Sequence, residues 1–292
     1  MKVIELEQGS AEWLAFRKDK IGGSDAPIIM GDSPYCTPYQ LWLDKLGLEE
    51  KKVNEWATSY GTRKEPIVRE MLKPLYSNNL KPMVIQDDIN NWMIASFDAV
   101  DLEKRMFREI KCLGKEDHYL TYQGEIPSRY KAQLQHQMMV VNEGLIYYDS
   151  YNEDVEQHEE KLYGLHVEAD LEYQERLYKK EQEFMQCLRT LTPPPMMERD
   201  YVDMDSPDWR LLCHQYRQAE LQLKECEKVK EELRKRIIST AGGLNAKGEG
   251  MKVSKVVRRG SVEYGVIPEL KGLDLEQYRK PSVVSWRIDV KE

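Results

Sequence analysis

A β-type segment over residues 80–112 constrains this chain most, because Asp98 is followed within it by Glu109, Ile110 and Lys111. Side chains alternate between the two faces of a strand, so Glu109 and Lys111 are predicted to share one face while Ile110 turns into the core. Asp98 precedes Glu109 by eleven residues and is expected to end the preceding strand of the same hairpin. The pattern therefore predicts that two carboxylates and one amine lie close together.

These residue types point to metal-assisted hydrolysis of a phosphodiester. Carboxylate oxygens bind hard cations such as Mg²⁺, with Mn²⁺ as a substitute, and a lysine beside them can orient or deprotonate an attacking water. The alternative is a solvated surface pair, since the Glu-x-Lys pattern begins at Glu49, Glu50, Glu109, Glu159 and Glu269. The copy that begins at Glu109 differs because Phe107 and Ile110 give it an apolar setting and Tyr130-x-x-Gln133 opens a helix downstream. This context favours the metal site.

Further blocks extend this pattern over about residues 1–190. They are, in order, Trp13-Leu-Ala-Phe-Arg17 with Gly22-Gly23-Ser24-Asp25-Ala26, Gly61-Thr-Arg-Lys-Glu65, Ser96-Phe97-Asp98, Glu109-Ile-Lys111-Cys112 and Tyr130-x-x-Gln133. Their order and spacing resemble the phage lambda exonuclease and YqaJ-like viral recombinase family, part of the PD-(D/E)XK nuclease superfamily. Agreement of several separated blocks is specific, whereas one block alone would be weak.

The resemblance implies a metal site and a catalytic set. Asp98 and Glu109 would be direct metal ligands, joined by the Ile110 carbonyl, and Glu65 would reach the metal directly or through water. Lys111 would position or activate water. Gln133 would hydrogen-bond that lysine or the scissile phosphate, which completes the catalytic set of Glu65, Asp98, Glu109, Lys111 and Gln133.

The resemblance also implies that Arg17 and Ser24 bind the terminal 5′-phosphate of the cut strand, a role suited to a guanidinium fork and a hydroxyl. Local alternatives exist for both residues. Arg17 could pair with Asp19 or Glu12 on an amphipathic helix, and Ser24 could cap a helix that begins near Asp25.

One of the proposed ligands, Glu65, has an alternative structural role, and the residues around another, Asp98, differ from the family pattern. Glu65 precedes Pro66, so it could simply be an acidic residue in the first turn of a helix, where the helix dipole favours it. The family often has proline before the aspartate and glycine after it, whereas Phe97 and Ala99 flank Asp98 here. The turn geometry expected at Asp98 is therefore open, but the carboxylate is present.

Composition limits the remaining function classes. The net charge of −8 over 292 residues argues against a protein that coats DNA without specificity, but a nuclease can confine positive potential to one channel. The five cysteines are scattered without Cys-x-x-Cys spacing, so neither a zinc ribbon nor a cysteine-bound iron–sulfur cluster is predicted. His118 and His136 lack a partner at ligand spacing and are interpreted as ordinary surface or edge residues.

The N-terminal residues contain no hydrophobic signal core, and no apolar run reaches membrane-spanning length. The expected location is therefore the reducing cytoplasm of a bacterial host, without a membrane partner.

The order of predicted elements indicates an α/β (α+β) fold with a PD-(D/E)XK, restriction-endonuclease-like core. Helices are expected at about residues 10–20 with Ser10 as cap, 37–47 with Pro38 in the first turn, 62–75, 129–142 and 171–191. Strands are expected within residues 80–112 and at 145–151 and 161–168. This order fits a mixed central sheet flanked by helices.

Thr192-Pro193-Pro194-Pro195 is the best candidate boundary, dividing a nuclease core at residues 1–195 from an extension at 196–292. A helix at about 207–239 carries apolar residues at three- and four-residue steps, which suits a seam against another helix of the same chain or of a neighbouring subunit. β structure is expected from residue 251 to 264. The basic residues of this segment are candidate DNA contacts, namely Lys252, Lys255, Arg258 and Arg259. Tyr130 of the core is a further candidate. A solvated edge strand is the equal alternative for the basic residues.

By resemblance, the expected activity is Mg²⁺-dependent digestion of one strand of linear double-stranded DNA from its 5′ end. The 3′ single-stranded tail would serve a phage annealing recombinase, and the enzyme would assemble as a homotrimeric ring around DNA. One alternative is a nicking or structure-selective endonuclease of the same superfamily. Another is a non-catalytic DNA-binding or assembly protein, although such a protein has no physical need for the whole cluster of Glu65, Asp98, Glu109, Lys111 and Gln133.

Overall fold

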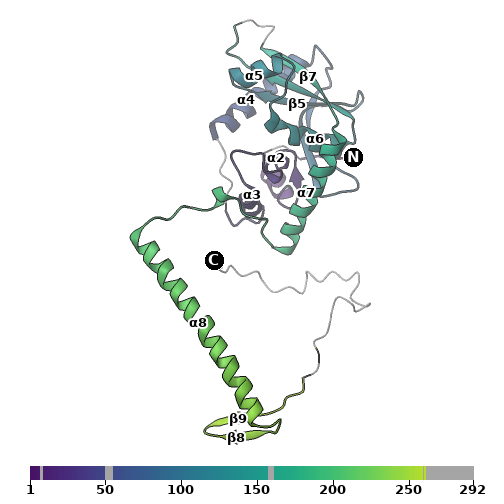
Figure 1. Ribbon diagram of the computed structural model, residues 1–292. Helices are drawn as coiled ribbons and strands as arrows, with labels where there is room; N and C mark the ends of the chain where they lie inside the picture. Colours follow the sequence, from purple (N-terminus) through teal and green to yellow (C-terminus); the bar gives the residue numbers. More distant parts are fainter. Residues whose placement is uncertain (7–8, 50–54, 157–160, 259, 261–292) are drawn as a thin grey trace. The chain divides into compact units, whose positions relative to one another are not determined.

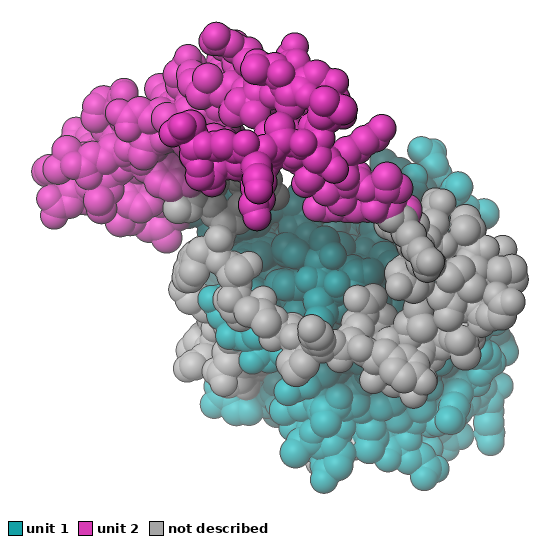
Figure 2. All heavy atoms as spheres, turned by 90° about the horizontal axis from the view of Figure 1, so that it is seen from below, with its two compact units in different colours: residues 1–201 teal, residues 202–292 magenta. Residues whose placement is uncertain are grey.

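The computed structural model describes residues 1–6, 9–49, 55–156, 161–258 and 260, with the backbone alone at residues 55–59. The chain divides into two compact units, residues 1–201 and residues 202–292 (Figure 2). This division lies a few residues beyond the boundary that the proline run suggested. No helix within the described ranges combines the length and the apolar composition needed to cross a bilayer.

A mixed seven-stranded sheet forms the centre of the first unit, with helices packed around it (Figure 1). Six strands lie in the order β1 (Lys2–Ile4), β3 (Lys81–Gln86), β4 (Met93–Asp101), β5 (Met106–Cys112), β6 (Leu145–Tyr151) and β7 (Leu162–Glu168). The short β2 (Ile21–Gly22) pairs with β4 in parallel, and β5 pairs with β6 in parallel. The expected mixed α/β fold is confirmed.

The described helices of this unit are α1 (Ala11–Phe16), α2 (Ala26–Ile29), α3 (Pro38–Lys45), α4 (Glu55–Leu72), α5 (Lys115–Tyr122), α6 (Lys131–Val141) and α7 (Leu171–Thr190), with the short 3-10 turns η1 (Ser128–Tyr130) and η3 (Glu198–Asp200). Ser10 caps α1 by accepting from the Trp13 N–H, and Thr37 forms a capping box with Gln40 at α3, as their sequence signals predict. The first helix is shorter than the expected 10–20 because the chain turns after Arg17 to pair Ile21 with Met93.

Helix α4 begins earlier than the sequence suggested. It starts at Glu55 and continues through Pro66, so Glu65 lies well inside the helix and not in its first turn. The reading of Glu65 as a first-turn residue is therefore wrong. A proline is normally taken as a sign of a helix start, but here it stands in the interior of α4 and only the tertiary structure reveals this.

Two apolar clusters hold α6 and α4 against the sheet. On one side, Phe97 and Phe107 pack with Leu134 and Met138 of α6. On the other side, Ala99 and Ile110 pack with Val68 and Leu72 of α4. Ile110 is completely buried, which confirms that it turns into the core.

A β-bulge in β4 lies at Asp98. Between β3 and β4, Met83 pairs with Phe97 and Lys81 pairs with Val100, so three residue steps of β4 match two of β3. The extra residue interrupts the alternation of faces, which explains why Phe97 and Ala99 pack into different clusters. The expectation that Asp98 ends the strand is wrong: β4 continues to Asp101, and a bulge, not a turn, directs the Asp98 side chain.

The second unit contains one long helix and one hairpin within its described part. Helix α8 (Pro207–Thr240) begins at Ser206, whose hydroxyl accepts from the Trp209 N–H, and none of its residues is buried. A hairpin of β8 (Ala246–Gly248) and β9 (Met251–Val253) follows. The β prediction from residue 251 holds for the first three residues, residues 254–258 form no strand, and residues 261–264 lie outside the described part.

Candidate active site

Glu109 is the most heavily contacted carboxylate of the predicted set. It is buried on β5, and its Oε1 accepts hydrogen bonds from Lys111 Nζ at 2.6 Å and from Gln133 Nε2 at 2.5 Å. Its Oε2 accepts from Gln137 Nε2 at 2.6 Å. Gln137 was missed by the sequence analysis, although its four-residue spacing from Gln133 puts both amides on one side of α6. Glu109 is thus oriented by three donors.

A hydrogen bond from the backbone of β5 holds the Asp98 side chain beside that strand. The β4–β5 ladder ends at the pair Ala99–Arg108, and next to it the Ile110 N–H donates to Asp98 Oδ2 at 2.8 Å. Arg69 of α4 donates to the Asp98 carbonyl at 2.6 Å. These contacts fix the bulge and keep the carboxylate next to β5.

Glu65 reaches this region from α4. A Cβ at position 61, one helical turn earlier, would come within 3.2 Å of Glu65 Oε1, so Gly61 leaves room for that oxygen. The charges of Glu109 and Lys111 both act on Glu65, which places the three side chains in one electrostatic cluster.

Asp98 and Glu65 are destabilised in their charged forms. Burial raises the pKa of Asp98 well above its ordinary value, and the charges of Glu109 and Glu65 raise it further. Burial also raises the pKa of Glu65, where Lys111 opposes the increase and Glu109 adds to it. Burial alone would lower the pKa of Lys111, but Glu109 and Asp98 outweigh it, so the pKa of Lys111 is raised and its amine stays charged at neutral pH.

This donor set fits a hard divalent cation in its chemistry. Three carboxylates that repel one another's charge need compensating positive charge, and their oxygens are the ligands that Mg²⁺ prefers. The geometry is not that of a preformed cage: among the described residues, no three His, Cys, Asp or Glu side chains are arranged so that they could hold an ion. Glu109 accepts hydrogen bonds from Lys111, Gln133 and Gln137, and Asp98 accepts one from the Ile110 N–H.

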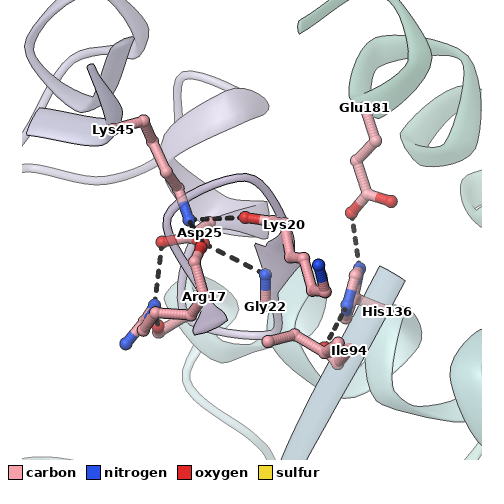
Figure 3. A network of polar contacts seen from close by, with 9 residues as sticks. Arg17, Lys20, Gly22, Asp25, Lys45, Ile94, His136 and Glu181 are labelled. Atoms are coloured by element: carbon pink, nitrogen blue, oxygen red, sulfur yellow. Dashed lines mark hydrogen bonds and ion pairs between the residues drawn. The ribbon is translucent and has the colours of Figure 1, made fainter. Parts of the chain in front are cut away.

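A second cluster surrounds Arg17 at the end of α1 (Figure 3). Arg17 Nη2 donates to Ser24 Oγ and to Asp25 Oδ1, both at 3.2 Å, and its guanidinium lies over the Trp13 ring. The predicted pair of Arg17 and Ser24 is therefore brought together. Both local alternatives fail, because Arg17 pairs with Asp25, and Ser24 is exposed and caps no helix.

Asp25 and Lys45 form the buried base of this cluster (Figure 3). Lys45 Nζ donates to Asp25 Oδ2 at 2.7 Å and to the carbonyl of Lys20 at 2.6 Å, while Asp25 Oδ2 accepts from the Gly22 N–H at 3.0 Å. Neither residue was predicted as part of a site, and Lys45 lies 20 residues from Asp25 in the chain. The pair fixes the turn after β2 that presents Ser24.

Gly23 connects the two clusters. A Cβ at this position would lie 3.2 Å from Cγ of Gln137 and 3.3 Å from Cγ of Gln133. These are the two amides that orient Glu109, and the neighbouring residue in the chain is Ser24. Because glycine has no side chain, the turn approaches α6 closely, and the Arg17–Ser24 pair lies next to the acidic cluster.

A buried ion pair supports the opposite face of β5. Arg108 donates to Asp149 of β6 through Nε at 2.8 Å and through Nη2 at 2.7 Å, and its guanidinium stacks between the rings of Tyr76 and Tyr147. A Cβ at Gly164 would lie 2.8 Å from Asp149 Oδ1, so glycine is required there. This pair sets β5 against β6 directly behind Glu109.

Both histidines interpreted as surface or edge residues are buried, so that interpretation is wrong. His118 Nδ1 lies 2.6 Å from Ser150 Oγ. His136 Nδ1 lies 2.7 Å from Glu181 Oε1, and His136 Nε2 lies 2.9 Å from the Ile94 carbonyl (Figure 3). Their partners come from other elements, which a search for ligand spacing could not detect.

The remaining predicted contacts are divided between the units. Tyr130 is half-buried against the core cluster, with Lys111 Nζ 5.4 Å from its ring centroid and Arg129 bonded to its hydroxyl. Lys252, Lys255 and Arg258 are exposed in the second unit, and Arg259 lies outside the described residues.

Comparison with known proteins finds a matching family model and similar curated proteins. Residues 12–143 match the family model of the YqaJ-like viral recombinase domain. The uncharacterised protein YqaJ of Bacillus subtilis is 30% identical over 138 residues, which cover 46% of this chain and 43% of that protein. A protein of African swine fever virus is 34% identical over 67 residues, covering 23% of this chain and 19% of its own length. The chain thus matches less than half of the length of these curated relatives.

A solved structure shows the same fold. An alkaline exonuclease from Laribacter hongkongensis superposes with a TM-score of 0.52 at 20% identity, over 63% of this chain and 94% of that chain. The complex of that exonuclease with dAMP matches equally.

Proposed function

We propose that this protein belongs to the YqaJ-like viral recombinase family, whose model residues 12–143 match, and that it is a metal-dependent deoxyribonuclease that digests one strand of linear duplex DNA from its 5′ end. The observation that carries the proposal is the contact of Gly23 with Gln133 and Gln137. It joins an acidic cluster suited to phosphodiester hydrolysis to an Arg–Ser pair suited to a terminal phosphate. The alkaline exonuclease with the same fold supports the nuclease class.

The catalytic residues divide the work between them. Asp98, Glu109, the Ile110 carbonyl and Glu65 would hold Mg²⁺, which when bound polarises the scissile phosphate and lowers the pKa of water. In the metal-free cluster Glu109 and Asp98 raise the pKa of Lys111 and keep it charged, and we assign it the role of orienting the attacking water and stabilising negative charge on the phosphate.

The glutamines of α6 act on the ligand and not on the substrate. Gln133 and Gln137 donate to different oxygens of Glu109, so they fix the rotation of its carboxylate. A ligand held in one orientation loses little freedom when it binds, which is the advantage of preorganisation.

The Arg17–Ser24 pair supplies the dependence on an end. Arg17 makes its protein hydrogen bonds through Nη2, and no described residue accepts from Nε or Nη1. Those two donors, with the exposed Ser24 hydroxyl, can bind a phosphate monoester. Such a group occurs at the 5′ end of a strand and not within it.

The decisive experiment compares DNA substrates that differ only at their ends. Linear duplexes labelled at the 5′ or the 3′ terminus, with and without 5′-phosphate, are incubated with the protein and Mg²⁺ beside a covalently closed plasmid. Rapid loss of strands from phosphorylated 5′ ends, with an intact plasmid, is expected. Nicking of the closed plasmid would instead support the endonuclease alternative. Lack of any hydrolysis, together with DNA binding, would support the non-catalytic alternative.

A further inference from the structure

The second unit separates its charges along the chain. Residues 202–227 hold six carboxylates and three cations, whereas residues 228–258 hold nine cations and three carboxylates, although the whole chain carries a net charge of −8. Within α8 this order follows the helix dipole, which favours acidic residues near the N-terminus and basic residues near the C-terminus. The dipole does not explain the cations beyond the helix.

Those cations lie on the hairpin and directly after it. Four basic residues and one carboxylate, Glu249, occur between residues 245 and 258; the basic residues are Lys247, Lys252, Lys255 and Arg258. All four are exposed, and none of them forms an ion pair with a carboxylate in the described part of the chain. In contrast, Arg234 and Lys228 of α8 are paired with glutamates of their own helix.

Lys247 and Lys252 lie directly opposite each other. The register pairs Ala246 with Val253 and Lys247 with Lys252. Val253 is half-buried and lines a groove against α8 with Leu233, and the exposed residues Lys252 and Lys255 border the same groove. Two like charges opposite each other on an antiparallel pair are destabilising. A bound anion would remove this repulsion.

We propose that the β8–β9 hairpin is a second DNA contact, in which Lys247 and Lys252 bind phosphates of the duplex backbone while Lys255 and Arg258 extend the contact. A two-stranded β ribbon has a width that the major groove accepts, and lysine is a point charge suited to the backbone without sequence preference. The identity of the polyanion rests on the proposed function. The surface itself lies wholly in the second unit and is tested separately from hydrolysis.

The test measures the salt dependence of binding to DNA without ends. A fluorescent dumbbell duplex, closed at both termini, is titrated with the full chain in EDTA, so that neither end recognition nor hydrolysis contributes. In Lys247→Gln/Lys252→Gln, the slope of log K against log salt should decrease by about 1.8, since each lost phosphate contact releases about 0.9 fewer counterions. Affinity at 0.15 M salt should be roughly ten- to thirtyfold weaker.

Two matched variants control for net charge and for folding. Arg210→Gln/Arg217→Gln removes the same charge from the acidic half of α8 and should leave the slope unchanged. Lys247→Arg/Lys252→Arg should restore it. The glutamine variant should keep its unfolding temperature, because it removes a repulsive pair from an exposed hairpin.

Distinct results would overturn the proposal. An equal slope in wild type and Lys247→Gln/Lys252→Gln would remove the hairpin from DNA binding, even if hydrolysis of linear duplex is normal. Weaker binding of this variant to phosphatidylserine vesicles, with unchanged DNA binding, would reassign the surface to anionic lipid. Conversely, the expected slope change in a protein that cuts no substrate would retain the hairpin contact and reject the nuclease.

Discussion

Gln137 Nε2 lies 2.6 Å from Glu109 Oε2, on the side of the carboxylate that neither Lys111 nor Gln133 contacts. The same amide also donates to the Ser96 carbonyl at 3.1 Å, so it ties α6 to β4 at the point where the bulge begins. Glu109 therefore depends on α6 for its orientation as much as on its own strand.

Gln137→Ala should reduce the hydrolysis rate by roughly ten- to a hundredfold, because a hydrogen bond to a charged group contributes about 1.5–3 kcal/mol. The measurement is kcat on a 5′-phosphorylated linear duplex. Gln174→Ala is the control, since Gln174 bonds Gln135 outside the acidic cluster and should leave kcat unchanged. Equal rates in Gln137→Ala and wild type would show that Glu109 needs no support from α6.

Lys111→Ala should abolish hydrolysis while DNA binding and folding persist. Loss of a group that positions the reacting water or phosphate typically removes on the order of 10²–10⁴ in rate. Because the raised pKa keeps Lys111 charged, Lys111→Arg should retain more activity than Lys111→Met, although both are long side chains. Equal activity in the last two variants would mean that the charge has no part in the reaction.

Asp98→Asn should stabilise the metal-free protein and inactivate it. The pKa of Asp98 is raised, so above that pKa the ionised carboxylate lowers the stability of the fold, and a neutral amide removes this cost. In EDTA at pH 8 the expected gain is about 0.5–2 kcal/mol, or roughly 2–4 °C per kcal/mol in the unfolding temperature. Mg²⁺ should raise the unfolding temperature of wild type more than that of the variant. A destabilised variant in EDTA would contradict this electrostatic account.

Arg17→Ala should slow digestion of 5′-phosphorylated ends by roughly ten- to a hundredfold, given about 1.5–3 kcal/mol for a charge-assisted hydrogen bond. On 5′-hydroxyl ends the effect should be much smaller, because the wild type has no terminal phosphate to bind there. The informative quantity is the ratio of the two rates. Lys18→Ala, which removes a neighbouring exposed cation, should leave the ratio unchanged. A similar decrease on both ends would make Arg17 a structural residue that acts through its bond to Asp25.

The local sequence pattern was sufficient to predict which residues of β5, the strand that carries the site, face the core. Alternation along β5 predicted that Ile110 is buried, and the structure confirms it. The seven-residue spacing of Arg17 and Ser24 also identified two side chains that meet. In each case the partners are close in sequence, so the backbone geometry of one element or turn determines their relationship.

The features that the sequence did not predict depend on residues that are distant in the chain. The bulge at Asp98 arises from how β4 pairs with β3, which the sequence of β4 alone does not specify. His136 was misread because Glu181 lies 45 residues away in the chain. The close approach of Gly23 to α6 likewise follows from the position of β2 beside β4.

The His136–Glu181 pair leads to a prediction about stability and pH. Burial by itself would lower the pKa of His136, but the Glu181 carboxylate and the Ile94 carbonyl raise it on balance. A raised pKa in the folded state means that the charged histidine stabilises the fold. This contribution is fully present below the unfolded pKa of about 6.5 and is lost as the pH rises through the folded pKa.

Glu181→Gln removes the carboxylate that raises the pKa of His136, so it should lower the free energy of unfolding by about 3–5 kcal/mol at pH 6, the usual effect of breaking a buried pair. The difference from wild type should become smaller between pH 6.5 and pH 9, measured by urea unfolding at each pH. Glu175→Gln, on the exposed side of α7, should change stability little at any pH. A difference between Glu181→Gln and wild type that stays constant over this range would show that His136 is neutral in the folded protein and that Glu181 acts only as a hydrogen-bond acceptor.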